Sequence, residues 1–284
     1  MKKLITAALK LLAISFAIQC ALVSASAVEK PNSDSNSDDV RTLTAEYVDE
    51  DMLKYAFATA VNDDAELIRI RVSRAQSEFD QPNLVEMLGN IQNLWSYRAP
   101  ETYNYTRNTG IRTVSRGNEF DIEIVLGNSY GLEIQSAHEQ KRIAETRAAE
   151  IYAELIANGC IPDGASQTEI ARAALEYICA NVTYVNDATD MCHTAYSALV
   201  NHYAVCDGYT GAYNLILKQA GITCYGIKGW AGGGCHEWTA AVLDGELRYI
   251  DSTWCDVEGE NPAIDISWFA VAPDSMPDHT AYYV

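Results

Sequence analysis

The chain has 284 residues, of which 48% are hydrophobic and 21% charged, and its 39 acidic against 20 basic side chains give a formal net charge of −19. This apolar content can form a buried core, which excludes a disordered chain, and a mean hydropathy of −0.12 excludes a polytopic membrane protein. The negative charge repels phosphate backbones and therefore argues against a nucleic-acid partner.

The N-terminal segment, residues 1–27, has the features of a secretory signal peptide. Two lysines precede an apolar run from Leu11 to Ile18, and an A-x-A cleavage pattern ends at Ala27. The run is too short to span a bilayer, so we expect cleavage after Ala27, a secreted or cell-surface protein, and no membrane span in the mature chain. An uncleaved anchor is the alternative.

Residues 28–160 carry no pattern that indicates chemistry. Residues 28–40 are polar, which predicts a flexible linker. Residues 41–160 alternate between helical and strand-like periodicity, which predicts a small N-terminal α/β region. Helices are expected over 50–60, 84–94 and 136–157, and strands over 67–72, 103–107, 111–114 and 120–125.

Residues 161–284 are richer in Cys, His, Gly and Trp and are expected to form a second, catalytic domain. Its first helix is predicted over 167–181, because Ser166 and Glu169 have the spacing of a capping box. Beyond this helix the residues that suit a reaction site follow in quick succession.

A β-hairpin is predicted around Asp244 and Gly245, because this dipeptide suits a two-residue turn and the flanking residues 237–250 alternate. In the matching register His236 and Asp251 lie on one buried face as diagonal neighbours, about 7–8 Å apart, while the other face is mainly polar. Because a buried carboxylate needs a partner, we expect the imidazole and the carboxylate to pair.

Cys206 begins a helical pattern that ends at Gly221, and the face that it shares with Tyr213 is expected to meet the hairpin. A cysteine in the first turn of a helix lies at the positive end of the helix dipole, which is expected to lower its pKa. Cys206, His236 and Asp251 then supply a nucleophile, a base and an orienting acid.

Three motifs follow one another in this region: Val205-Cys206-Asp207-Gly208-Tyr209, His236-Glu237-Trp238 and Asp251-Ser252-Thr253-Trp254. They resemble the bacterial secreted transglutaminase-like superfamily, whose members share a papain-like core. The resemblance covers the chain from about residue 165 onward. It implies an α+β fold in which the helix bearing the nucleophile packs on an antiparallel sheet, with Cys206 as nucleophile, His236 as base and Asp251 as third member.

Other aromatic and histidine residues near these motifs are given lesser roles. Three aromatic residues are expected to line the substrate cleft rather than to react: Trp238, Trp254 and Tyr209. Three histidines are expected to be structural or to lie at the rim of the site: His193, His202 and His279.

Seven cysteines follow the predicted signal peptide, and setting Cys206 aside leaves an even number that suits disulfides in a secreted protein. They are Cys160, Cys179, Cys192, Cys224, Cys235 and Cys255. Their connectivity is open, with a modest preference for Cys235 paired to Cys255 or to Cys192. No CxxC or HxxxH spacing is present, so we expect no metal site and no cofactor.

These observations predict a secreted cysteine-dependent acyl-transfer enzyme that forms a thioester on Cys206. We expect it to hydrolyse peptide or amide bonds as a cysteine peptidase or amidase, with a protein or peptide as substrate, cell-wall peptide included. Two alternatives stay open: cross-linking of protein glutamine to amines, and a non-catalytic cell-surface module that binds peptides.

Overall fold

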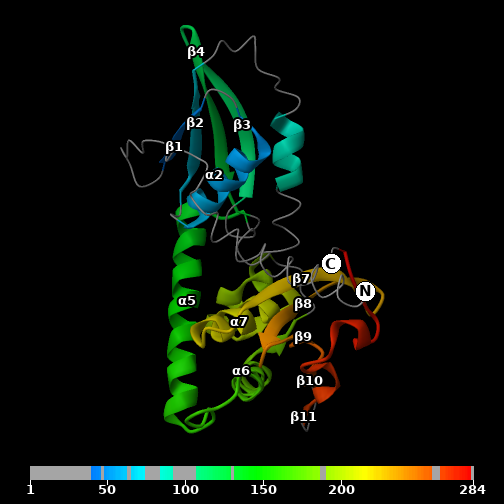
Figure 1. The fold of residues 1–284 in the computed structure, drawn as a ribbon. Helices are drawn as coiled ribbons and strands as arrows, with labels where there is room; N and C mark the ends of the chain where they lie inside the picture. The colour runs from blue at the N-terminus through cyan, green and yellow to red at the C-terminus, as the bar shows by residue number, and fades with distance from the viewer. Residues whose placement is uncertain are drawn as a thin grey trace. The chain divides into compact units, whose positions relative to one another are not determined.

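The computed structural model describes residues 40–45, 48–62, 65–73, 84–91, 107–128, 131–185, 190–257 and 263–282. The chain divides into two compact units, Met1–Leu94 with Thr106–Asn128 and Trp95–Tyr105 with Ser129–Val284 (Figure 1). The predicted signal peptide lies outside the described residues, as does the predicted linker up to Val40, which instead begins the first strand. No helix in the described part of the chain is long and apolar enough to cross a membrane.

The first unit is built on a four-stranded sheet and includes helix α2. Its elements are β1 (Val40–Ala45), α2 (Glu50–Asn62), β2 (Leu67–Val72), β3 (Arg107–Arg116) and β4 (Glu119–Gly127). The sheet order is β1-β2-β4-β3, with β1 parallel to β2 and the other pairs antiparallel. Residues 84–91 are also helical. The expected strand residues 103–106 and the helical residues 92–94 lie outside the described part.

Strand β4 shows why this sheet has two different faces. Alternate residues from Phe120 to Leu126 are buried and apolar, as a half-buried strand requires. Between them Asp121 and Glu123 are also buried, and their charges are balanced by arginines, with Glu123 accepting hydrogen bonds from Arg69 and Arg112. These arginines hold the pKa of Glu123 below its usual range, although burial acts in the opposite direction.

The second unit contains three long helices, α5 (Ile134–Ala157), α6 (Gln167–Asn181) and α7 (Cys206–Gln219). The predicted capping box of α6 is present, because the Ser166 side chain accepts from the Glu169 backbone N–H and the Glu169 carboxylate accepts from that of Ser166. The boundary between the units differs from the predicted one at residue 160. Helix α5 falls in the second unit, because its buried stripe packs in the same core as α6 and α7.

The main sheet of the second unit has the order β12-β7-β8-β9 and is antiparallel throughout. Its strands are β7 (Cys224–Ala231), β8 (Gly234–Leu243), β9 (Glu246–Ile250) and β12 (His279–Ala281). Two small sheets pair β5 (Thr183–Tyr184) with β6 (Tyr203–Ala204) and β10 (Asp256–Val257) with β11 (Ala263–Ile264). Short helical turns are η2 (Asp190–His193), η3 (Ser197–Asn201), η4 (Ile266–Trp268) and η5 (Pro273–Ser275). Helices packed on an antiparallel sheet confirm the predicted α+β class.

Strand β8 is buried on both faces, whereas its alternating pattern predicted one buried and one mainly polar face. Helix α7 covers one face, where Asn214 accepts a hydrogen bond from Thr239 and the Thr210 hydroxyl donates to the Glu237 carbonyl. On the other face Trp238 and Ala240 pack with a second apolar cluster. The face expected to be mainly polar is therefore a helix-packing face, and its polar side chains fix α7 to the sheet.

Candidate active site

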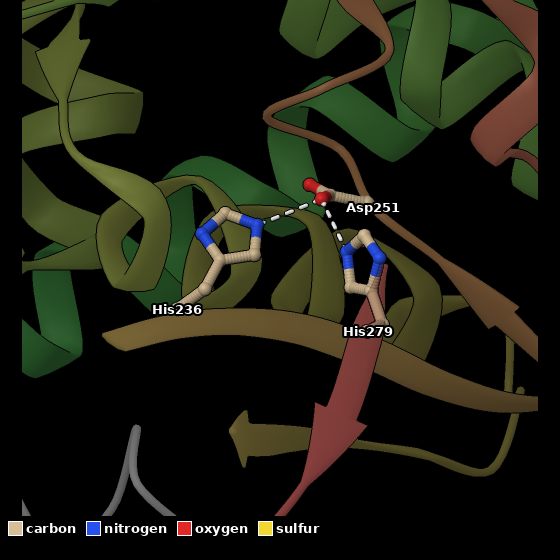
Figure 2. Close-up of side chains that lie close together, drawn as sticks. All are labelled: His236, Asp251 and His279. Atoms are coloured by element: carbon tan, nitrogen blue, oxygen red, sulfur yellow. Dashed lines mark hydrogen bonds and ion pairs between the residues drawn. The ribbon is translucent and has the colours of Figure 1, made fainter. Parts of the chain in front are cut away.

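His236 and Asp251 form the centre of the site. Nε2 of His236 lies 2.7 Å from Oδ2 of Asp251 (Figure 2). The Asp251 side chain has no exposed surface and that of His236 is 8% exposed. Oδ1 of Asp251 accepts two further hydrogen bonds, from the backbone N–H groups of Thr253 and Trp254. The carboxylate is thereby held in one orientation toward the imidazole.

The hairpin that presents this pair has the predicted register. Strands β8 and β9 pair from Leu243 opposite Glu246 to Thr239 opposite Ile250. The two-residue turn is Asp244-Gly245, and both residues have positive φ, 51° and 84°. Because side chains alternate along a strand, this register brings His236 and the residue just after β9 to the same side of the sheet.

The charge of Asp251 is stabilised by its donors. Burial alone raises the pKa of this carboxyl, but hydrogen bonds from His236 and His279 outweigh it and hold the pKa below its usual range. Asp251 is therefore ionised at neutral pH. Since Nε2 of His236 must then carry a proton to donate, the basic lone pair of the neutral ring is on Nδ1.

Cys206 is the first residue of α7, following Val205 at the N-cap position. A backbone hydrogen bond from Glu237 reaches its sulfur, which places the thiol against strand β8 at the residue after His236. Within the described residues no hydrogen bond joins Cys206 to His236. Catalytic hydrogen bonds in unliganded sites are often long and shorten when a substrate binds, and the pairing of Cys206 with His236 stays a prediction.

The expected lowering of the Cys206 pKa is wrong for this unliganded state. Burial raises the pKa of the thiol to about 12, and the negative charges of Asp207 and Glu237 act in the same direction. The helix N-terminus favours a thiolate, but desolvation and two neighbouring carboxylates oppose it. The thiol form of Cys206 is therefore favoured at neutral pH.

Asp207, next to Cys206, has a histidine partner of its own. Nδ1 of His193, the last residue of η2, lies 2.9 Å from both carboxylate oxygens of Asp207. The close approach of this segment requires Gly208, since a Cβ there would lie 2.8 Å from the Cys192 carbonyl oxygen. His193 was expected to be structural or at the rim, and its side chain is 39% exposed.

His279, expected to be structural or at the rim, also contacts the buried carboxylate. Its Nε2 lies 3.0 Å from Oδ2 of Asp251, the same oxygen that His236 contacts, and its side chain is 1% exposed. In Figure 2 the two imidazoles flank the carboxylate. His279 comes from β12, a three-residue strand near the end of the chain, and no motif or spacing links it to the hairpin.

These three side chains are the one group of potential metal ligands gathered within the described residues. The distances from Oδ2 of Asp251 to the two imidazole nitrogens, 2.7 and 3.0 Å, are those of N–H···O hydrogen bonds. A metal would have to sit between ligand atoms that already contact each other directly. The group is therefore a hydrogen-bonded cluster.

Of the three predicted cleft residues, two are in the core instead. Tyr209 is fully buried, and its hydroxyl donates to Asp256 and lies 2.9 Å from the Val182 carbonyl oxygen. Trp238 is also fully buried, with its ring centroid 4.9 Å from that of His279. Trp254 is half-buried beside His236, with ring centroids 5.4 Å apart, and its predicted place in the cleft stays a prediction.

No disulfide joins any of the seven described cysteines, so the preferred disulfides of Cys235 do not form in this structure. Cys235 is exposed, and its sulfur lies 3.0 Å from the Tyr282 hydroxyl. Cys192 and Cys255 are buried.

The chain was compared with known proteins. No family model matches it. It is 29% identical over 105 residues to kyphoscoliosis peptidase from Mus musculus, a match that covers 31% of this chain and 16% of that protein. The chain thus spans a small part of that relative's length.

Solved structures show weaker likenesses. One, a transglutaminase, has a TM-score of 0.34 at 14% identity and covers 69% of this chain and 53% of that one. Another, a candidate cysteine protease from Cytophaga hutchinsonii, has a TM-score of 0.34 at 10% identity, with 61% and 70% covered.

Proposed function

We propose that this chain is a transglutaminase-like and papain-like protein. On that premise, it is a cysteine peptidase or amidase that acts through a thioester on Cys206. The observation that carries the proposal is the 2.7 Å hydrogen bond between Nε2 of His236 and Asp251, whose charge is near enough to Cys206, the first residue of α7, to raise the pKa of its thiol. A nucleophile, a base and a group that orients the base are the parts that acyl transfer needs.

The first half of the reaction transfers the acyl group to sulfur. Nδ1 of His236 takes the proton of the Cys206 thiol as the sulfur attacks the substrate carbonyl carbon. The backbone N–H of Cys206 is suited to stabilise the resulting oxyanion. When the C–N bond breaks, the proton on Nδ1 goes to the leaving amine and a thioester remains.

The second half regenerates the enzyme. His236 takes a proton from water as the water oxygen attacks the thioester carbon. The C–S bond breaks, the acid product leaves, and the proton returns to sulfur. Asp251 stays ionised throughout and stabilises the imidazolium that forms in each half. We favour water over an amine as acceptor because water needs no second binding site.

The proposal is tested by acylation of the full chain with p-nitrophenyl acetate, followed by peptide mass spectrometry. We expect a burst of nitrophenolate and an acetyl group on Cys206. His236→Ala should slow the burst by about 10²- to 10⁴-fold, because the general base is lost. Cys160→Ala removes an exposed thiol of the same unit and should change nothing, which makes it the matched control.

Acetylation that is confined to Cys160 and Cys235, or a Cys206 rate that His236→Ala leaves unchanged, would show that the chain is not an enzyme of this kind. A non-catalytic peptide-binding module is the reading that such a result favours. If the burst is present, cleavage of a peptide mixture supports hydrolysis, and incorporation of a labelled amine into glutamine without cleavage supports cross-linking.

We further propose that the protein is secreted after removal of residues 1–27 and acts on protein or peptide substrates outside the cytoplasm. The lysines and apolar run of that segment support this location. N-terminal sequencing of protein from the culture medium should begin at Val28. A start at Met1 in a cell-bound fraction would contradict it.

A further inference from the structure

We propose that His279 is a positioning residue that is held as an imidazolium, and that its charge neutralises Asp251 so that His236 rests as a neutral base. The proposal rests on the proposed function, since it concerns the base of that reaction. It assigns a role to a buried histidine that the reaction as described does not use.

The first observation is that both nitrogens of His279 face acceptors. Nδ1 lies 2.7 Å from the carbonyl oxygen of Pro277, and Nε2 lies 3.0 Å from Oδ2 of Asp251. A carbonyl oxygen and an ionised carboxylate only accept hydrogen bonds, so each nitrogen must donate. An imidazole that donates from both nitrogens carries two protons and a positive charge.

The second observation is the aromatic cage around this ring. The indole centroids of Trp238, Trp254 and Trp268 lie 4.9, 4.7 and 5.6 Å from that of His279. Two of the three contacts are close to edge-on, with interplanar angles of 86° and 69°. The three rings help to bury the His279 side chain, which is 1% exposed, so a cation here and Asp251 form a buried ion pair.

The third observation is how few charges surround the pair. Within the described residues, the titratable groups that contact His279 are Asp251 and the ring of His236, whose centroid is 5.6 Å away. The adjoining Asp278 is exposed. The negative charge of Asp251 and the positive charge of His279 therefore have nearly opposite and equal effects on His236. The hydrogen-bond acceptor of His236 belongs to a pair with little net charge.

This balance has a chemical consequence. A lone carboxylate beside His236 would favour its protonated form and so remove the base. A neutral Asp251–His279 pair still orients His236 through the 2.7 Å hydrogen bond but leaves Nδ1 free of a proton.

The experiment uses His279→Gln in the full chain, because the glutamine amide can still donate to Asp251 but carries no charge. The acylation rate of Cys206 is measured from pH 5 to 9. Without the cation, the acid limb of the profile should move up by about one pH unit or more, while the rate at its plateau changes less than about threefold. His202→Asn, an exposed histidine of the same unit, is the matched control and should leave the profile in place.

An acid limb that stays in place in His279→Gln overturns the proposal, as does a loss of rate that is equal at every pH, which is the behaviour of a purely structural residue. If wild-type Cys206 is not acylated at all, it is the proposed function that fails.

A second measurement then tests the charge of His279 independently of the acylation of Cys206. Side-chain ¹⁵N NMR of Cys206→Ala at pH 7 should show two similar N–H shifts for His279, whereas one protonated and one bare nitrogen would overturn the proposal.

Discussion

Asp251 accepts four hydrogen bonds, two from the backbone that follows it and two from imidazoles on other strands. A fully buried carboxylate needs this many donors, because each unpaired lone pair would cost desolvation energy. At the scale of single residues, the site is therefore organised around the acid. Its donors fix both the direction of its oxygens and its charge.

Asp251→Asn should destabilise the chain by about 3 kcal/mol at pH 7, because two imidazole donors lose a buried charged acceptor. The folded pKa of Asp251 lies below the ordinary value of 3.8, so its contribution is complete above that pH and is lost as the pH falls through the folded value. Urea unfolding at pH 7 and pH 3 checks this. A difference between wild type and variant that is the same at both pH values would contradict it.

Cys206 should show the reactivity of a buried neutral thiol. Because its pKa is raised to about 12, the thiolate fraction should rise with pH across the whole range from 6 to 10. Alkylation by iodoacetamide, followed by mass spectrometry of the Cys206 peptide, should accelerate throughout that range. A plateau between pH 5 and 8 would instead reveal a preformed thiolate–imidazolium pair.

At the scale of elements, the β8–β9 hairpin joins the site to the helical layer. Asp244 lies in the turn of this hairpin, and its carboxylate accepts hydrogen bonds from the backbone N–H groups of Gln167 and Thr168 at the start of α6. The Gln167 side chain in turn accepts from the backbone N–H of Asp244. The turn thus supplies the negative charge that a helix N-terminus favours.

Asp244→Asn tests this contact without disturbing the turn, because Asn-Gly is also suited to two positive φ angles. The melting temperature should fall slightly at pH 7. Hydrogen bonds from Thr168 hold the pKa of Asp244 below 3.8, so the difference should disappear as the pH falls through the folded value. Thermal melts of wild type and variant at pH 7 and pH 3 measure this difference in melting temperature. A difference that persists at pH 3 would contradict a role for the negative charge of Asp244.

Gly229 in strand β7 lies against Trp238, one of the three indole rings around His279. A Cβ at this position would collide with the Trp238 ring and with the Thr280 carbonyl oxygen. Gly229→Ala should therefore cost about 1–3 kcal/mol and reduce acylation of Cys206. Gly234→Ala, where a Cβ meets nothing within 4 Å, is the matched control for urea unfolding. Equal effects of the two changes would refute the packing argument.

A feature could be predicted from the sequence when the residues that determine it lie close together along the chain. The hairpin register and the α6 capping box depend on residues a few positions apart, and both were predictable. His279 and the burial of Cys206 depend on segments that are distant in sequence, so their partners could not be inferred. The stripe on α5 predicted a helix, but an apolar stripe does not state which core it packs against.

At the scale of the whole molecule, every residue of the site lies in the second unit, and the first has its own core. Ile122→Asp places a charge at a fully buried position of the first unit and should unfold that unit alone. Calorimetry should show the loss of one transition, and the acylation rate of Cys206 should stay within about twofold. Loss of acylation would show that the two units depend on each other.

The two-residue turn of the hairpin also limits where this chain can gain or lose residues. His236 and Asp251 are 15 positions apart, and the turn between them is fastened to α6. A single insertion in either strand would send one side chain to the opposite face, and a longer loop would detach the helix cap. Insertions and deletions among homologues should therefore be absent from residues 236–251. In an alignment, the residue 15 positions after the counterpart of His236 should then be the counterpart of Asp251.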